Sequence, residues 1–142
     1  MRNHKISLNE AIKFHGHLGP WLVLGLVMGE YALKKLKANK YFGLKVKVWG
    51  ANRRPKSCLI DGLQLSTGAT YGKGNIRKVS SDKVMVDFSG SGDKRGIVCI
   101  LNKRLETRLK NTHDHKENEK LAKKIYSLNP GTLFNIKTKK VA

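Results

Sequence analysis

The segment from Pro20 to about Leu36 is the feature that most constrains how this chain folds. Its apolar side chains fall on nearly every side of a helix instead of forming one stripe, which is typical of a helix that is buried all round. Pro20 suits the first helical position, because a backbone N–H there would have no partner within the helix. Gly25 and Gly29 lie four residues apart and would leave a flat groove on one face. We therefore predict a central helix packed closely against a strand or against the next helix.

The remaining periodicities predict an α+β domain. Ser7 and Glu10 form the signature of a capping box, which predicts a short helix that ends near Phe14. Alternating side chains predict a strand over 44–49. Further along, we predict a third helix that starts at 53–55, strands over 84–88 and 96–101 joined by a turn over 90–93, a helix over 116–128 and a last strand over 133–136. No repeat or linker interrupts this pattern, so we predict a single domain over 1–142, with a mixed or antiparallel sheet packed on the buried apolar helix.

The charge balance is strongly basic, with 29 Lys and Arg residues against 10 Asp and Glu residues and a net charge of +19. Two interpretations stay open: the basic surface engages a polyanion such as nucleic acid, or it is only a soluble basic surface. The lysines are scattered along the chain and form no single tract. Aromatic residues make up 7% of the chain and do not recur beside basic residues at stacking intervals, which argues against binding of single strands.

The cysteines and the apolar runs predict a reduced, cytoplasmic protein. Cys58 and Cys99 are too few for a disulfide framework, and residues 1–12 are too polar for a secretion signal. The longest apolar run, over 21–28, is far shorter than the ~20 residues that cross a bilayer, so we expect no membrane association. Cys99 lies within an apolar run and is predicted to be a buried core thiol.

Two histidines stand on either side of a glycine, as His15-Gly16-His17. On a helix their side chains would point about 200° apart and could not share a ligand. In the extended turn that Gly16 favours, both can face one site. The alternative interpretation is that one histidine caps the following helix and the other is structural.

Cys58 and Asp61 stand three residues apart near the start of the third predicted helix, and so on one face of it. A helix N-terminus lowers the pKa of a thiol, and Asp61 could accept a hydrogen bond from a metal-ligating histidine. Histidine and thiolate together suit zinc or another transition metal. The alternative is that Cys58 is a small buried hydrophobic residue and Asp61 is a surface acid.

A glycine-rich loop follows this helix over 68–75. Its glycine spacing and the glycine at position 74 exclude a P-loop. Backbone amides around Lys73, with Thr70 and Asn75, could form a cradle for a small anion, and a plain flexible loop is the alternative. The His113-Asp114-His115 cluster lies in a run of charged residues, and we predict a solvated loop there.

These motifs resemble the E-subunit family of formylmethanofuran dehydrogenase over roughly residues 8–100. The matching positions in the first motif are Phe14, His15, Gly16, His17, Pro20, Gly25 and Gly29. Those in the second are Cys58, Asp61, Gly62, Gln64, Thr67, Gly68, Thr70, Gly72, Lys73, Gly74 and Asn75.

The resemblance implies an α+β domain, commonly a homodimer, with a metal, usually zinc, near the histidine turn and the helix cysteine. It implies His17 and Cys58 as ligands, with His15 close by. The family takes its name from a molybdenum or tungsten enzyme that reduces carbon dioxide onto methanofuran, and the E protein does not resemble the catalytic subunit that carries the pterin.

This chain departs from the family pattern at two positions of the first motif. Gly19 stands where members often have a cysteine, which removes one potential ligand, and Trp21 replaces a glycine and would crowd the same mouth. Some relatives also have a C-terminal zinc ribbon, whereas no cysteine follows Cys99 here.

The sequence thus supports two hypotheses of different classes. In the first, a dimeric E-subunit-like domain binds a metal or a small anion in one cleft formed by the histidine turn, Cys58, Asp61 and the loop over 70–75. It would act alone or as an accessory subunit of a redox complex. In the second, the chain is a basic nucleic-acid-binding module with a vestigial metal site. No complete catalytic set is visible, so no reaction is assigned.

Overall fold

The computed structural model describes residues 5–92 and 94–140. Residues 1–4, part of the polar N-terminal segment, and Asp93, in the predicted turn, lie outside the described residues. The elements in chain order are α1 (Leu8–His15), α2 (Pro20–Lys35), β1 (Leu44–Trp49), α3 (Cys58–Thr67), β2 (Ile76–Val79), β3 (Met85–Gly90), β4 (Arg95–Leu101), α4 (Lys103–Asn111), α5 (His115–Ser127), the short 3₁₀ helix η1 (Pro130–Thr132) and β5 (Phe134–Lys140).

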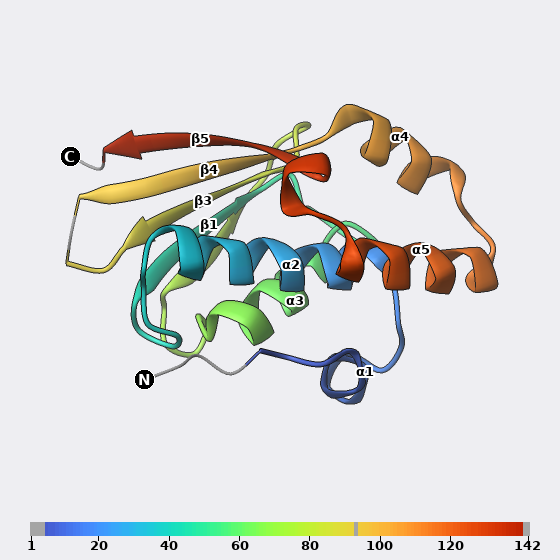
Figure 1. The fold of residues 1–142 in the computed structure, drawn as a ribbon, viewed down its shortest axis with the longest axis horizontal. Coiled ribbons are helices and arrows are strands. Elements are labelled where there is room, and N and C mark those ends of the chain that lie inside the picture. The colour runs from blue at the N-terminus through green and yellow to red at the C-terminus, as the bar shows by residue number, and fades with distance from the viewer. Residues whose placement is uncertain (1–4, 93, 141–142) are drawn as a thin grey trace.

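The strands form one mixed sheet in the order β2-β1-β3-β4-β5. Strand β1 pairs in parallel with β2, and the other neighbours pair antiparallel. Helices α2, α3 and α5 lie together beside the sheet (Figure 1). Side chains from one sheet face and from α2 share a core, in which Val48, Phe88, Leu24 and Met28 are fully buried. The predicted α+β architecture, with a mixed sheet on a buried apolar helix, is confirmed.

Glycines let α2 and α3 touch backbone to backbone. A Cβ on Gly25 would lie 2.3 Å from the carbonyl oxygen of Leu59 and 2.8 Å from the Cα of Gly62. A Cβ on Gly29 would lie 1.9 Å from the Ser66 hydroxyl oxygen. The close approach predicted from the glycine spacing is therefore confirmed, and the partner is α3. Because α3 begins with Cys58, this contact also fixes where the thiol lies relative to α2.

Helix starts differ from the prediction at two places. Helix α3 begins at Cys58 and not at 53–55, because the residues before it form turns. In these turns the Cys58 N–H donates to the Pro55 carbonyl, and the Leu59 N–H donates to the Lys56 carbonyl. Helix α5 begins at His115, since the Asp114 side chain accepts a hydrogen bond from Glu117 N–H and caps the helix there. The capping box of Ser7 and Glu10 is present as predicted.

Three elements were absent from the prediction: β2, α4 and the one-turn helix η1. Strand β2 has only four residues, of which the first is buried, the next two are exposed and the last is half-buried, so it shows no alternation. Helix α4 is highly charged, but the Asn102 side chain caps it, and Leu105 and Leu109 stand four residues apart on it.

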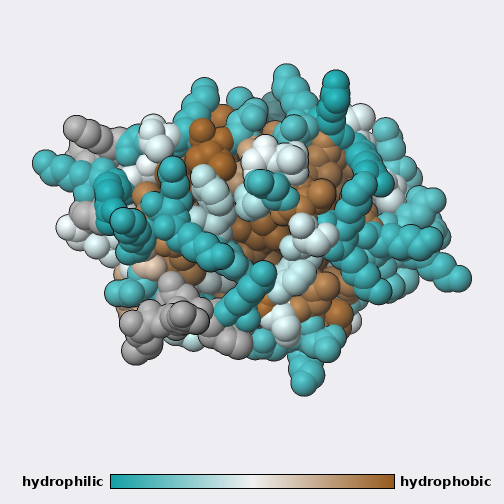
Figure 2. All heavy atoms as spheres, in the orientation of Figure 1, coloured by the Kyte–Doolittle hydropathy of each residue, from teal (hydrophilic) through white to brown (hydrophobic). Residues whose placement is uncertain are grey.

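Hydrophilic side chains are spread over the face of the molecule seen in Figure 2, with smaller hydrophobic areas between them. In the part of the chain that the structure describes, no helix has both the length and the apolar character that a membrane span requires.

Candidate metal and small-ligand site

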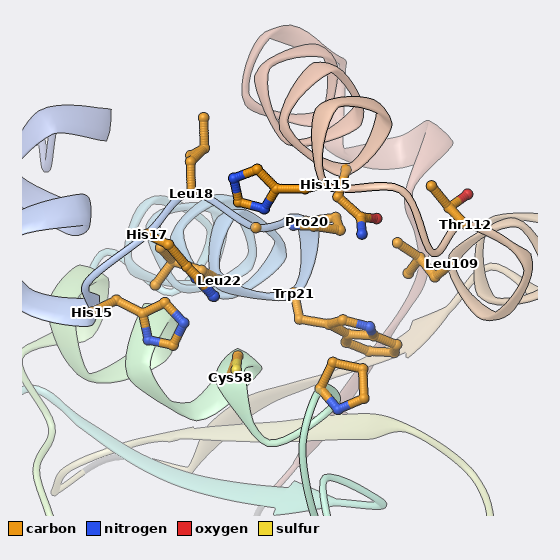
Figure 3. Close-up of a pocket in the computed structure, with 13 residues that line it drawn as sticks. His15, His17, Leu18, Pro20, Trp21, Leu22, Cys58, Leu109, Thr112 and His115 are labelled. Carbon is orange, nitrogen blue, oxygen red and sulfur yellow. The ribbon is translucent and has the colours of Figure 1, made fainter.

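A cavity of about 140 Å³ opens between the start of α2, the start of α3 and the α4–α5 connection. Figure 3 shows its lining side chains, with His15, His17 and Cys58 toward one side and Trp21, Leu109 and Thr112 toward the other. The lining residues in the described part of the chain are His15, His17, Leu18, Gly19, Pro20, Trp21, Leu22, Pro55, Cys58, Leu109, Thr112, His115 and Asn118.

The turn after α1 brings both predicted histidines to this cavity. Helix α1 ends at His15, and Gly16 takes the left-handed backbone conformation with φ of 102°, which glycine adopts without steric cost. The rings of His15 and His17 then lie with their centroids 4.6 Å apart. His15 is the deeper of the two, with a side chain that is 9% exposed, whereas His17 is open to solvent.

Asp61 on α3 orients the His15 ring. His15 Nδ1 lies 2.6 Å from Asp61 Oδ2. An ionised carboxylate can only accept a hydrogen bond, so Nδ1 carries the proton, and Nε2 of the neutral ring has a free lone pair. His15 Nε2 is buried and has no hydrogen-bond partner among the described residues. An unpaired buried acceptor costs about 1–3 kcal/mol, so this atom is poised to bind a donor or a cation.

Cys58 lines the cavity from the first turn of α3 and is half-buried. Burial raises the pKa of its thiol, the charge of Asp61 raises it further, and Arg54 opposes both effects. The prediction that the helix N-terminus lowers this pKa is therefore wrong, because desolvation and the nearby carboxylate outweigh the helix dipole. The thiol is protonated at neutral pH, and a metal that binds it has to displace the proton.

The glycine-rich loop does not line this cavity. Helix α3 has ten residues, so its ends are ~15 Å apart, with Cys58 at one end and the loop at the other. The structure therefore does not bring Thr70, Lys73 and Asn75 into the cavity that Cys58 lines. These side chains also hold the loop itself: Lys73 Nζ donates to the Gly68 carbonyl, and the Asn75 side-chain oxygen accepts from Thr70 N–H.

Part of the cavity wall was not predicted as a site. His115 was assigned to a solvated loop, but it lines the cavity as the first residue of α5, and its Nε2 lies 2.9 Å from Glu119 Oε1. The pattern of Asp114 followed three residues later by Glu117 could have indicated the helix start. Trp21 also lines the cavity and is 4% exposed, so it lies in the wall.

Comparison with known proteins places this chain in a family. The family model described as "FmdE, Molybdenum formylmethanofuran dehydrogenase operon" matches residues 14–135. The chain belongs to the FmdE family. The match confirms the resemblance seen in the two motifs and extends it beyond residue 100 to β5.

A solved structure shares the FmdE fold of this chain. It is the crystal structure of a tungsten formylmethanofuran dehydrogenase FmdE-like protein from Syntrophus aciditrophicus, with a TM-score of 0.70 and 22% sequence identity. The match covers 95% of this chain and 71% of that one. At this identity the likeness establishes the fold.

A curated relative from Archaeoglobus fulgidus is described as a probable S-adenosyl-L-methionine-binding protein. It is 29% identical over 96 residues, which are 67% of this FmdE chain and 26% of the relative. The chain therefore spans about a quarter of that protein's length.

The FmdE cavity offers three imidazoles, those of His15, His17 and His115, and one thiol, although among residues 5–92 and 94–140 no three His, Cys, Asp or Glu side chains already converge as a ligand set. The orphaned, carboxylate-oriented Nε2 of His15 is the feature that fits a metal, since ligating histidines generally donate their other ring N–H to a carboxylate or carbonyl. Gly19 also lines the cavity, so the position where the family often has a cysteine faces the same space.

Proposed function

We propose that this FmdE domain binds a transition metal, with zinc as the first choice, together with a small ligand in the cavity. The observation that carries the proposal is His15, whose Nδ1 is held by Asp61 and whose buried Nε2 has no partner among the described residues. His15, His17 and Cys58 would hold the metal, because imidazole nitrogen and thiolate sulfur are ligands that zinc accepts.

The chemistry that zinc would supply is polarisation of a carbonyl or activation of water. The chain's own contribution is selection by size and polarity. A cavity of about 140 Å³ is much smaller than the roughly 300–1,000 Å³ of sites for drug-sized ligands. It is comparable to an apolar cavity of ~150 Å³ that holds benzene. We therefore propose a ligand of one-ring size or smaller, which a nucleoside cofactor exceeds.

Trp21 and Leu109 supply an apolar wall to this ligand, while Thr112 and Asn118 supply polar groups on the α4–α5 side. The net charge of +19 favours anionic ligands. We assign anion binding to this cavity and not to the loop at the other end of α3, where Lys73 already bonds the Gly68 carbonyl.

The family model's description, which names a formylmethanofuran dehydrogenase operon, supports a role as an accessory subunit of such a dehydrogenase. Assembly as a homodimer and residence in the cytoplasm stay predictions.

Cobalt substitution tests the metal site directly. We expect about one cobalt or zinc per chain and a thiolate-to-cobalt absorption band that disappears in Cys58→Ser and persists in Cys99→Ala. Cys99 is a suitable control because it is fully buried in the sheet, where burial raises its pKa to about 12. Bound metal should also protect Cys58 from alkylation. Failure of the reconstituted wild-type protein to retain metal, or a band unchanged in Cys58→Ser, would refute the proposal.

A cysteine at position 19 should strengthen the site. Among the described residues other than its two chain neighbours, the atom nearest to a Cβ on Gly19 would be His17 Cε1, at 3.8 Å. The backbone there is extended, so the side chain fits. We expect Gly19→Cys to bind zinc roughly tenfold more tightly or better, where each tenfold corresponds to about 1.4 kcal/mol. Gly19→Ser is the matched variant, and competition with a chelator measures both. Equal affinity of the two variants would show that position 19 does not reach the metal.

A further inference from the structure

A basic groove lies over β1, β2 and β3, at the edge of the sheet where β2 is the last strand. It is separate from the cavity. It is shallow, with a volume of about 470 Å³, and its lining includes Lys45, Lys47 and Arg77. The strand register explains this gathering, because Lys47 is the partner of Arg77 on β2 and of Asp87 on β3. Among the described residues of the lining, Asp87 is the one carboxylate, and Lys139 from β5 pairs with it. The groove is therefore strongly positive.

Three exposed aromatic side chains belong to segments that adjoin the groove-lining residues in sequence. Tyr41 is 54% exposed, Phe42 is 72% exposed and Tyr71 is 51% exposed. Tyr41 and Phe42 precede β1, and Tyr71 belongs to the glycine-rich loop, which lies beside that segment (Figure 1). A group of exposed aromatic side chains on adjoining segments can mark a binding surface, whereas a single exposed one does not.

A hydrogen bond joins the groove to the aromatic segment, and the glycine-rich loop adds cation–π contacts. Asn75 lines the groove, and its side-chain N–H donates to the Tyr41 carbonyl at 2.8 Å. Lys73 Nζ lies 5.4 Å from the centroid of the Phe42 ring and 6.0 Å from that of Tyr41. The glycine-rich loop therefore supports the aromatic residues and adds a cation to them.

Tyr41 is held in an unfavourable backbone conformation, with φ of 79°. A non-glycine residue in this region costs on the order of 1–3 kcal/mol, and glycine or asparagine would avoid much of that cost. The exposed ring is thus kept at the expense of stability, which favours a role in binding.

From this arrangement we propose that the groove and the three aromatic residues bind single-stranded nucleic acid. Lys45, Lys47 and Arg77 would contact phosphates, and the exposed rings would stack with bases, as in other single-strand sites. Charge complementarity favours this occupant over a second copy, because each copy carries a net charge of +19. The proposal does not depend on the metal site.

Filter binding with a uridine homopolymer about 12 nucleotides long tests the assignment. We expect Phe42→Ala to weaken binding about tenfold or more, since one base stacked on one ring contributes that much. The matched control is Phe14→Ala on α1, an aromatic residue that is 56% exposed and lies outside the groove, and it should leave binding unchanged.

The double variant Lys45→Gln with Arg77→Gln neutralises fewer phosphates, so its affinity should depend less on salt. The slope of log affinity against log salt should become shallower by ~0.7 for each phosphate that is no longer neutralised. Its control is Lys116→Gln with Lys123→Gln on α5. Circular dichroism verifies that each variant is folded.

Four outcomes would overturn the proposal. The first is absence of binding at low salt, and the second is equal weakening in the groove and α5 variants, which would indicate a diffuse basic surface. The third is binding that Phe42→Ala leaves intact, which would indicate a polyanion held without stacking. A dimer in size-exclusion chromatography that Phe42→Ala dissociates, without nucleic-acid binding, would assign the surface to a second copy.

Discussion

Replacing Gly25 by alanine is expected to destabilise the protein by about 3 kcal/mol. This is a large share of the free energy of unfolding of a typical domain, which is about 5–15 kcal/mol. The new Cβ would meet backbone atoms, the Leu59 carbonyl oxygen at 2.3 Å and the Gly62 Cα at 2.8 Å. Backbone cannot rotate away as a side chain can, so α2 and α3 have to move apart. Urea denaturation followed by circular dichroism measures the decrease in stability.

Two other glycines provide graded controls. At Gly29 the nearest atom is the Ser66 hydroxyl oxygen, the end of a rotatable side chain, so Gly29→Ala should cost less than Gly25→Ala. At exposed Gly72 the nearest atom to a Cβ lies 3.9 Å away, and Gly72→Ala should change stability by no more than about 0.5 kcal/mol. If Gly25→Ala unfolded at the same urea concentration as Gly72→Ala, the backbone contact between α2 and α3 would be refuted.

Asp61→Asn is expected to weaken zinc binding by about 10–100-fold, the usual effect of removing a partner that orients a ligating histidine. The change removes the charge that holds His15 Nδ1–H. It also removes one of the two causes that raise the pKa of Cys58, which by itself would favour metal binding. Burial, the larger cause, remains in the variant, so we expect the effect at His15 to dominate.

The pH dependence follows from the raised pKa of Cys58. Below that pKa the thiol is protonated, so each metal bound releases its proton, and affinity should rise about tenfold per pH unit. Isothermal titration between about pH 6 and 8 in two buffers would measure both affinity and proton release. Exposed Asp82→Asn is the matched control. Equal affinities of Asp61→Asn and wild type would show that Asp61 does not support a ligand.

The buried helix and the sheet could be predicted because their patterns are long. Sixteen residues of α2 are apolar on nearly all sides, and β1 alternates over its full length. Strand β2 could not be recognised, since its four residues gain their place by pairing with β1, a contact that is distant in sequence. Helix α4 could have been recognised from Asn102 and the spacing of Leu105 and Leu109, which a high local charge obscured.

The site was predictable only where local geometry decides it. Gly16 indicated a turn that lets His15 and His17 face one space, and the spacing of Cys58 and Asp61 placed both on one side of α3. Closeness in sequence misled for Lys73, because the rigid helix α3 carries the loop away from Cys58. Sequence order likewise hid the meeting of Tyr41 with Asn75, which only the tertiary fold creates.

The positions of the two tryptophans have a practical consequence. Trp21 lies in the wall of the cavity, and Trp49 lies on β1 beside the groove, with Lys47 Nζ 4.7 Å from its ring centroid. Each proposed binding surface thus contains or adjoins one natural fluorophore. With Trp49→Phe the remaining emission reports on the cavity, and with Trp21→Phe it reports on the sheet, so the same protein can be titrated optically at either surface without a label.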